Sequence, residues 1–241
     1  MTKKLAVTLA MFAEAIAENE SRDAHNLTVA ESQIAAQALA QAQVDVDSLY
    51  RAEMRTAFDS RASYEHAKNA ANESIQRTIS DLAKSCDHDS IARIFRAAQI
   101  DSNFINKSER ISARFNVYSA QKVVNIARAI AKVESLNHYS RAIFASAIAL
   151  QNADMQISHH DAASACSLNV KTTANREKLL SKYAKHVEAN TAATQSSSSI
   201  NALKAFDILR ETRDSANVVC YDVNRESAAT IALASIMQIA L

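Results

Sequence analysis

The strongest fold signal lies in one segment, called the deciding stretch below: Thr191-Ala-Ala-Thr-Gln-Ser-Ser-Ser-Ser-Ile-Asn-Ala-Leu-Lys-Ala-Phe206. Its apolar residues Ile200, Leu203 and Phe206 recur every three positions, so they lie on one stripe of a helix. The other side of that helix carries short polar side chains. The spacing therefore predicts a helix that buries one side and presents small polar groups on the other.

The residues around this helix extend the pattern. A basic amphipathic helix is expected from Asn175 to about Val187, followed by a short break at residues 188–190. After the deciding stretch, residues 207–212 and 218–223 are rich in alternating β-branched residues and flank a polar turn. Two such runs around a polar turn predict a small β-hairpin.

A helix, a turn, a second helix and a two-stranded wing resemble the winged helix-turn-helix family over roughly residues 157–224. The resemblance rests on the small-residue-rich helix, on the stretch Ala202–Glu211 and on the hairpin. Family members usually have glycine where Asp207 stands. We therefore expect Asp207 to adopt a conformation that glycine prefers.

The resemblance implies that the deciding helix faces the major groove of duplex DNA, where short polar side chains approach base edges closely. The base-facing residues it implies are Thr194, Gln195, Ser197, Ser198 and Asn201. Eight basic side chains are the candidates for phosphate contacts. They are Lys171, Arg176, Lys178, Lys182, Lys185, Lys204, Arg210 and Arg213.

A second interpretation of the same segment remains open. The run Gln195-Ser-Ser-Ser-Ser199 also suits a low-complexity helix start or a linker, and winged helices serve as protein-interaction modules as well.

The composition excludes several classes of protein. The 241 residues include no Gly, no Pro and no Trp. The two glycine-rich phosphate-binding motifs, GxGxxG and GxxxxGK(S/T), are therefore absent. Glycine-built oxyanion nests and nucleophile elbows are also absent, which argues against a hydrolase. The expectation is a mainly α protein that is not an enzyme and has no cofactor, metal or small-molecule ligand.

Clusters of metal-ligand types are interpreted as helix caps. Cys86-Asp-His88-Asp89 and His159-His160-Asp161 lack the spacing of a four-ligand zinc site. Cys166 and Cys220 are expected in the core. Three widely spaced cysteines form no disulfide framework and favour a cytoplasmic protein.

Charge divides the chain into two expected domains. Residues 1–105 carry a net charge of −4 and residues 106–241 a net charge of +5. The first is expected to be an acidic helical region, resembling a hairpin or coiled coil, that mediates oligomerisation or partner contacts. The second is expected to be a basic helical domain that contains the winged helix.

Local signals place the helix boundaries. A capping box at Thr28 and Glu31 predicts a helix to about Gln43, and residues 45–48 offer a break before a long helix from Leu49 to about Lys84. Residues 87–90 are expected to cap a short helix. Ser119 is the expected N-cap of a later helix, and Ser158 with Asp161 is the expected capping box of another. The residues expected in left-handed C-caps are Asn137, Asn152, Asn169 and Asn190.

Both ends of the chain carry apolar segments. Residues 1–17 have the basic and apolar parts of a signal peptide, but Leu5, Leu9, Phe12 and Ile16 form the stripe of an ordinary packed helix. The apolar run Ala228–Leu241 is expected to pack on the core or on a second copy. Neither segment is long enough to span a membrane.

These patterns together predict a duplex DNA-binding protein, with a role in transcription regulation, replication or genome maintenance, in a phage or plasmid. Homo-oligomerisation is expected through the N-terminal helices or the C-terminal helix. The alternative is a helical structural protein of a virion or scaffold, in which the winged helix binds other proteins.

Overall fold

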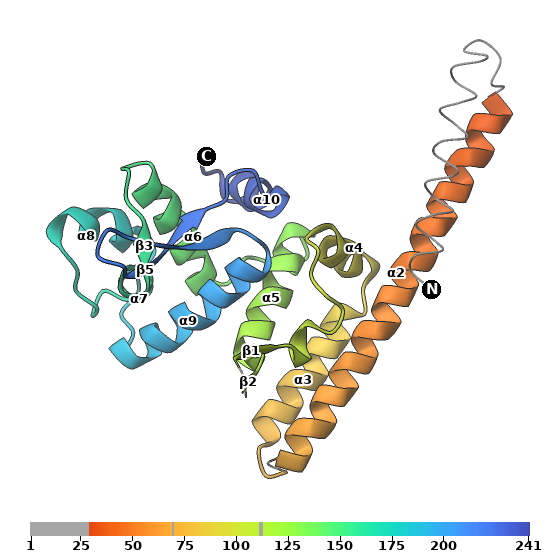
Figure 1. Ribbon diagram of the computed structural model, residues 1–241, viewed down its shortest axis with the longest axis horizontal. Helices are drawn as coiled ribbons and strands as arrows, with labels where there is room; N and C mark the ends of the chain where they lie inside the picture. The colour runs from red at the N-terminus through yellow and green to blue at the C-terminus, as the bar shows by residue number, and fades with distance from the viewer. Residues whose placement is uncertain (1–28, 69, 111–112) are drawn as a thin grey trace. The chain divides into compact units, whose positions relative to one another are not determined.

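The computed structural model describes residues 29–68, 70–110 and 113–241 (Figure 1). The chain divides into two compact units, Met1–Val46 and Asp47–Leu241. In the first unit, the described residues form the beginning of helix α2 (Val29–Lys68). The helix expected at residues 5–16, the signal-peptide pattern and the cap at Thr28 lie outside the described residues.

The expected break at residues 45–48 is wrong, because α2 continues through it. Asp47 is buried, and its carboxylate forms ion pairs with the side chains of Arg93, at 3.4 Å, and Arg96. Its carboxylate therefore serves a contact with helix α4 (Asp89–Ala97) rather than a helix cap. A residue that looks like a local stop signal is used here for tertiary structure.

The long helix expected to reach Lys84 is divided in two. Helix α3 (Glu73–Cys86) begins after Asn72, whose side chain accepts the Ile75 N–H at 3.2 Å. Arg55 of α2 pairs with Asp87, the C-cap of α3, at 2.6 Å, so the two helices run side by side (Figure 1). The expected helical hairpin is confirmed, with its turn between the two helices. His88 caps α4, within the segment expected to do so.

Aromatic rings connect this hairpin to the rest of the second unit. Phe104, in the 3-10 turn η1 (Phe104–Asn106), contacts Phe58, Phe95 and Phe115 edge to face, with centroids 5.6–6.2 Å apart. Phe95 also contacts Phe206, at 6.0 Å. All five rings are buried. The change of charge near residue 105 therefore falls inside one continuous core.

Four further helices precede the deciding stretch. They are α5 (Val117–Ile130), α6 (His138–Gln151), α7 (His159–Cys166) and α8 (Ala174–Leu180), and a 3-10 turn η2 (Ser181–Tyr183) follows α8. The expected cap of α5 is wrong: Asn116 caps the helix, and Ser119 is buried within it. The capping box of Ser158 and Asp161 is confirmed. The basic helix expected at residues 175–187 is shorter, since α8 ends at Leu180.

The deciding stretch forms helix α9 (Ala189–Ala205), which packs against α5, α6 and α7. Ile200, Leu203 and Phe206 are buried, as the spacing predicts. Strands β4 (Leu209–Arg213) and β5 (Val219–Val223) then form the expected hairpin.

A third strand joins this hairpin. β3 (Ile157–Ser158) pairs with β5, so that Ile157 lies opposite Tyr221 and the antiparallel sheet has the order β3-β5-β4. Two residues are too short a run for sequence periodicity to indicate a strand. A separate pair, β1 (Ser108–Arg110) and β2 (Ala113–Arg114), precedes α5.

After several helices, residues other than glycine or asparagine adopt the left-handed conformation, which the sequence predicted only for Asp207. Positive φ angles occur one to three residues after the ends of five helices, at Gln99, Lys132, Asp154, Asp207 and Gln238, where φ is 52° to 58°. The asparagines expected in left-handed C-caps do not have positive φ angles. Asn137 is the N-cap of α6, and Asn152 is right-handed with φ −67°.

Each of these five turns is closed by the same hydrogen bond. The N–H of the next residue donates to the carbonyl five positions earlier, for example Val133 to Arg128 and Ile208 to Leu203, both at 2.9 Å. The residue after each turn is apolar: Ile100, Val133, Met155, Ile208 and Ile239. This is the Schellman arrangement, in which an apolar contact accompanies the left-handed residue. Asp207 takes the conformation that its position in place of glycine predicted.

The described residues are thus mainly helical with a small antiparallel sheet, as expected from sequence. Helix α10 (Ala228–Met237) packs on α5 and buries Ala229, Leu233 and Ala234, while Ile231 is exposed. In the residues that the structure describes, no helix combines the length and apolar composition that a membrane span requires.

Candidate nucleic-acid interface

The exposed side of α9 is narrow. Ala192, Ser196, Ser199 and Ile200 are buried against the neighbouring helices. Thr194, Ser197 and Lys204 are exposed, and Asn201 between them is half-buried. We call these four residues the α9 stripe. It consists of three short polar side chains and one cation. Successive members are three or four residues apart, so they lie along one side of the helix.

The hydroxyls on this stripe are held by the helix itself. Thr194 Oγ1 donates to the Asn190 carbonyl at 3.0 Å, and Ser197 Oγ donates to the Ala193 carbonyl at 2.9 Å. A hydroxyl that donates to its own helix keeps its lone pairs for an outside donor, and it can rotate towards an outside acceptor.

Of the expected base-facing residues, one is buried and another borders a neighbouring pocket. Ser198 is buried at 5% exposure, so its expected position on the exposed side is wrong. Gln195 is half-buried and lines a pocket with residues of α5, including Tyr118 and Lys122. Packing of α9 against α5 covers this part of the helix, and a single-helix pattern contains no information about that neighbour.

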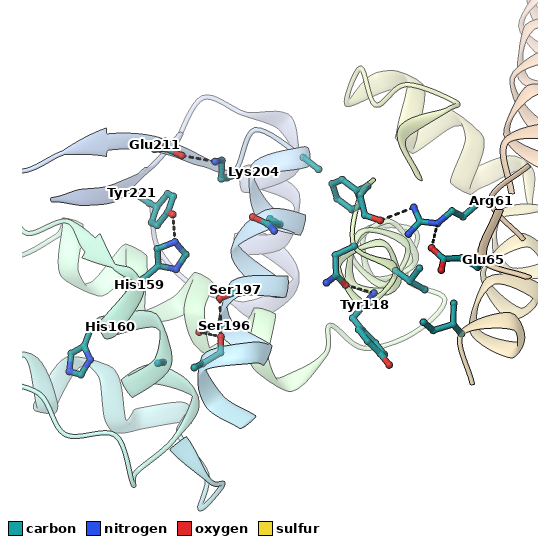
Figure 2. A pocket seen from close by; sticks show the side chains of 18 of the residues that line it. Arg61, Glu65, Tyr118, His159, His160, Ser196, Ser197, Lys204, Glu211 and Tyr221 are labelled. Atoms are coloured by element: carbon teal, nitrogen blue, oxygen red, sulfur yellow. Dashed lines mark hydrogen bonds and ion pairs between the residues drawn. The ribbon is translucent and has the colours of Figure 1, made fainter. Parts of the chain in front are cut away.

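Three residues of the α9 stripe, Ser197, Asn201 and Lys204, line one wall of a cleft of about 1340 Å³ (Figure 2). On this wall lie Ser196, Ser197 and Lys204 of α9, with His159 and Tyr221 beyond them. The other wall carries Arg61 and Glu65 of α2, together with Tyr118 at the start of α5, which is 47% exposed.

The charges of the second wall are committed to the fold. Arg61 is 4% exposed, its guanidinium donates to the carbonyls of Ile105 and Phe115, and it pairs with Glu65 at 2.8 Å. Figure 2 shows the guanidinium between Glu65 and a backbone carbonyl. Arg61 therefore holds three segments of chain together and has little capacity left for a ligand.

The first wall has a connected set of polar groups. Tyr221 Oη lies 2.7 Å from His159 Nε2, and Lys204 pairs with Glu211 at 2.7 Å (Figure 2). The Lys204 ammonium also lies 5.8 Å from the centre of the Tyr221 ring. Burial raises the pKa of Tyr221 to about 12. Desolvation, with the charge of Lys204, lowers the pKa of His159.

Five of the eight expected phosphate contacts have intramolecular partners. Arg176 pairs with the buried Asp161, Lys204 with Glu211, and Arg210 with Asp207. Lys171 lies 3.8 Å from Glu177, and Arg213 donates to the Asn217 carbonyl within the hairpin turn. The pair of Arg176 with Asp161 is structural, because it joins α8 to the capping box of α7.

The other three are placed differently. Lys178, Lys182 and Lys185 are exposed and make no ion pair in the described part of the chain. They lie on α8, on η2 and in the segment that leads into α9. We call them the α8 lysines. Their charge is available to an outside anion.

The clusters of possible metal ligands remain helix caps. His88 Nδ1 accepts the Ser90 N–H at 3.3 Å, and His160 Nε2 lies 2.8 Å from the Lys171 carbonyl. No group of three or more metal-ligand side chains occurs within residues 29–68, 70–110 and 113–241. Cys86, Cys166 and Cys220 are buried thiols, as expected for the latter two, and burial raises the pKa of Cys86 and Cys166 to about 12.

Sequence reasoning missed Tyr118 and Lys122, which line the surface between α5 and α9. A signal existed for the lysine. Lys122 stands four residues before Ile126 and eight before Ile130, on the apolar stripe of α5, where a charged residue is unusual.

Comparison of the chain with protein-family models, curated proteins and solved structures gives no match.

Proposed function

We propose that this protein binds duplex DNA, with α9 in the major groove and the β4–β5 hairpin beside it. The α9 stripe carries the proposal: short polar side chains on a helix that is buried on its other side and is followed directly by a hairpin. A helix, turn and two-stranded wing is the arrangement that the resemblance to the winged helix-turn-helix family implies.

Base contact is assigned to Ser197 and Asn201, with Thr194 beside them. An asparagine amide can pair with the N6 and N7 positions of adenine, and a hydroxyl can donate to or accept from a base. Thr194 lies in the N-terminal half of α9, from which recognition helices read base edges, while Ser197 lies at the middle of the helix and Asn201 one turn further along.

Phosphate contact is assigned to the α8 lysines. Their charges have no carboxylate to neutralise them among the described residues, and they precede the N-terminal half of α9 in the chain. Neutralised phosphates release counterions, so affinity depends on salt. Arg213, at the end of β4 in the hairpin, is a further candidate.

The proposal is tested with the full chain and a randomised duplex pool, by fluorescence anisotropy and selection of bound sequences. The wild-type protein is expected to enrich a defined site. Ser197→Ala and Asn201→Ala should lose preference at one or two positions of that site, by about 1–3 kcal/mol for each bidentate contact. Thr191→Ala is the matched control, an exposed residue of the same helix outside the stripe. Unchanged preference in the Asn201 variant would contradict the role of α9, and absent binding at low salt would contradict DNA binding itself.

A second candidate function is a protein-interaction module in a helical assembly. The cleft favours it in one respect: its walls carry the pairs Arg61–Glu65 and Lys204–Glu211, with charges of both signs. Mixed charge suits a protein partner better than a polyanion. Sedimentation over a range of protein concentrations, at high salt and without DNA, tests this function. Growth into large assemblies supports it, and a single small species contradicts it.

A further inference from the structure

Lys122 is a buried cation without a carboxylate partner. The residue, in α5, is 8% exposed. Its Nζ lies 3.5 Å from Asn137 Oδ1 and 5.0 Å from the centre of the Tyr139 ring. Among the residues that the structure describes, no carboxylate oxygen comes within ion-pair distance of it. Buried ammonium groups are otherwise paired, because the loss of hydration is costly.

The amide and the ring indicate that the group is charged when folded. An amide oxygen and the face of an aromatic ring both stabilise a cation. Burial lowers the pKa of Lys122 to about 8, which leaves most of the side chains protonated at pH 7. The fold therefore holds a positive charge that it only partly compensates.

This charge borders a pocket of about 220 Å³ between α5 and α9. The pocket is lined by Tyr118, Gln121, Lys122, Asn125, Asn137 and Gln195. One part of its lining is rigid. Asn125 Oδ1 accepts the backbone N–H of Asn137 at 2.8 Å and its Nδ2 at 2.9 Å, which turns Asn137 Oδ1 towards Lys122 and the Ser140 N–H.

Three other side chains that carry donor groups line the same pocket: Tyr118 and Gln121 are exposed, and Gln195 is half-buried. Their hydroxyl and amide groups make no hydrogen bond with any other residue that the structure describes. Tyr118 and Gln121 come from the first turns of α5, and Gln195 comes from α9. A cation and three neutral donors thus surround a space with room for several atoms, since one water takes about 30 Å³ in the liquid.

We infer that this pocket binds a phosphate-type oxyanion, with the Lys122 ammonium as its charged ligand and Tyr118, Gln121 and Gln195 as neutral donors. An oxyanion supplies the missing counter-charge and accepts hydrogen bonds from all four groups. The ligand is either a phosphate of a nucleic-acid backbone beside α9 or a free phosphate group. Only the first source rests on the proposed function.

The first experiment uses the wild-type full chain and inorganic phosphate. The pKa of Lys122 is measured by NMR on protein with isotope-labelled lysine, tyrosine and glutamine, with and without phosphate. Binding to the protonated form should raise this pKa and shift the signals of Tyr118 and Gln195. A pKa and signals that phosphate leaves unchanged would overturn the inference.

Variants identify the ligands. Lys122→Met is expected to weaken phosphate binding by about tenfold or more, because it removes the charge-assisted contact. Lys132→Met is the matched control, since it removes one charge from an exposed lysine just after α5. Gln195→Ala, on the rim formed by α9, should weaken binding several-fold even if Lys122→Met does not fold. Equal phosphate affinity in Gln195→Ala and wild type would contradict the assigned ligand set.

Duplex DNA separates the two sources. If the oxyanion is a backbone phosphate, Lys122→Met should flatten the slope of log K against log salt by about 0.9. An unchanged slope, together with lost phosphate binding, assigns the site to a free phosphate group. A chain that binds inorganic phosphate but no duplex would retain this inference and refute the proposed function.

Discussion

The hydroxyl oxygen of Tyr221 and Nε2 of His159 share a hydrogen bond of 2.7 Å, which ties strand β5 to the first turn of α7. The two rings also meet edge to face, with centroids 5.3 Å apart. When the imidazole is neutral with its proton on Nδ1, Nε2 accepts the hydroxyl proton, and when Nε2 is protonated it donates to the hydroxyl oxygen. It joins the sheet to the helices at the wall of the cleft.

The surroundings of His159 make folding stability depend on pH. Desolvation and nearby cations lower the pKa of His159, and also of His138, below the ordinary 6.5. A depressed folded pKa means that the unfolded chain binds the proton more readily. The stabilisation is therefore complete above pH 6.5 and is lost as pH falls through the folded pKa.

We expect the urea midpoint of the wild-type protein to fall between pH 7 and pH 5. His159→Gln keeps an acceptor for Tyr221 but does not titrate, so its midpoint should fall less over the same range. Equal pH dependence in the variant and the wild type would show that His159 is not the responsible group.

Replacement of Arg61 is expected to lower the free energy of unfolding more than replacement of an arginine in an exposed ion pair. Arg61→Met leaves Glu65, whose side chain is 12% exposed, without its partner and removes the donor to two buried carbonyls. Breaking a buried pair in this way costs about 3–5 kcal/mol of the free energy of unfolding. Arg55→Met is the control, because the pair of Arg55 with Asp87 is exposed and contributes less than about 1 kcal/mol. Denaturant unfolding of both variants measures the difference, and similar losses would contradict the prediction.

Lys132 offers a stabilising substitution. It adopts φ 58° after α5, a conformation that glycine takes without steric cost. Lys132→Gly should raise the free energy of unfolding by about 0.5–1 kcal/mol, after allowance for the greater freedom of glycine in the unfolded chain. The same change inside a helix, Lys84→Gly in α3, should lower it by about 1 kcal/mol. Thermal unfolding of the two variants would contradict this account if both shifted in the same direction.

The α8 lysines predict the salt dependence of DNA binding. Replacement of Lys178, Lys182 and Lys185 by Gln should flatten the slope of log K against log salt by about 2.7, which corresponds to three phosphate contacts. The matched control replaces Arg77, Lys84 and Lys132, three exposed basic residues in other parts of the fold, and should leave the slope unchanged. Anisotropy at several salt concentrations measures the slope for both triple variants. An equal change in the two slopes would show that the α8 lysines act only through the net charge of the protein and not through phosphate contacts.

Several features followed from short-range patterns in the sequence. The spacing of Ile200, Leu203 and Phe206 predicted the buried side of α9, and Ser158 with Asp161 predicted the start of α7. The left-handed turn at Asp207 and the hairpin after it were also predicted. These features depend on residues within one turn of helix or one strand pair, so the local sequence contains the physical cause.

The helix ends show where local rules were incomplete. Asparagine was expected to replace glycine, but Gln99, Lys132 and Gln238 take the left-handed conformation instead. What these positions share is an apolar residue directly after them, whose N–H closes the turn. The identity of the strained residue mattered less than the hydrogen bond that follows it.

Tertiary structure alone decided which polar residues can meet a ligand. Ser198 and Gln195 belong to the same run as Ser197, yet packing against neighbouring helices buries the first and turns the second towards α5. In the same way Asp47 extends a helix because Arg93 and Arg96 reach it from α4, and Lys122 loses its water because α5 lies in the core. Each outcome depends on partners far away in the sequence, whose position exists only once the chain has folded.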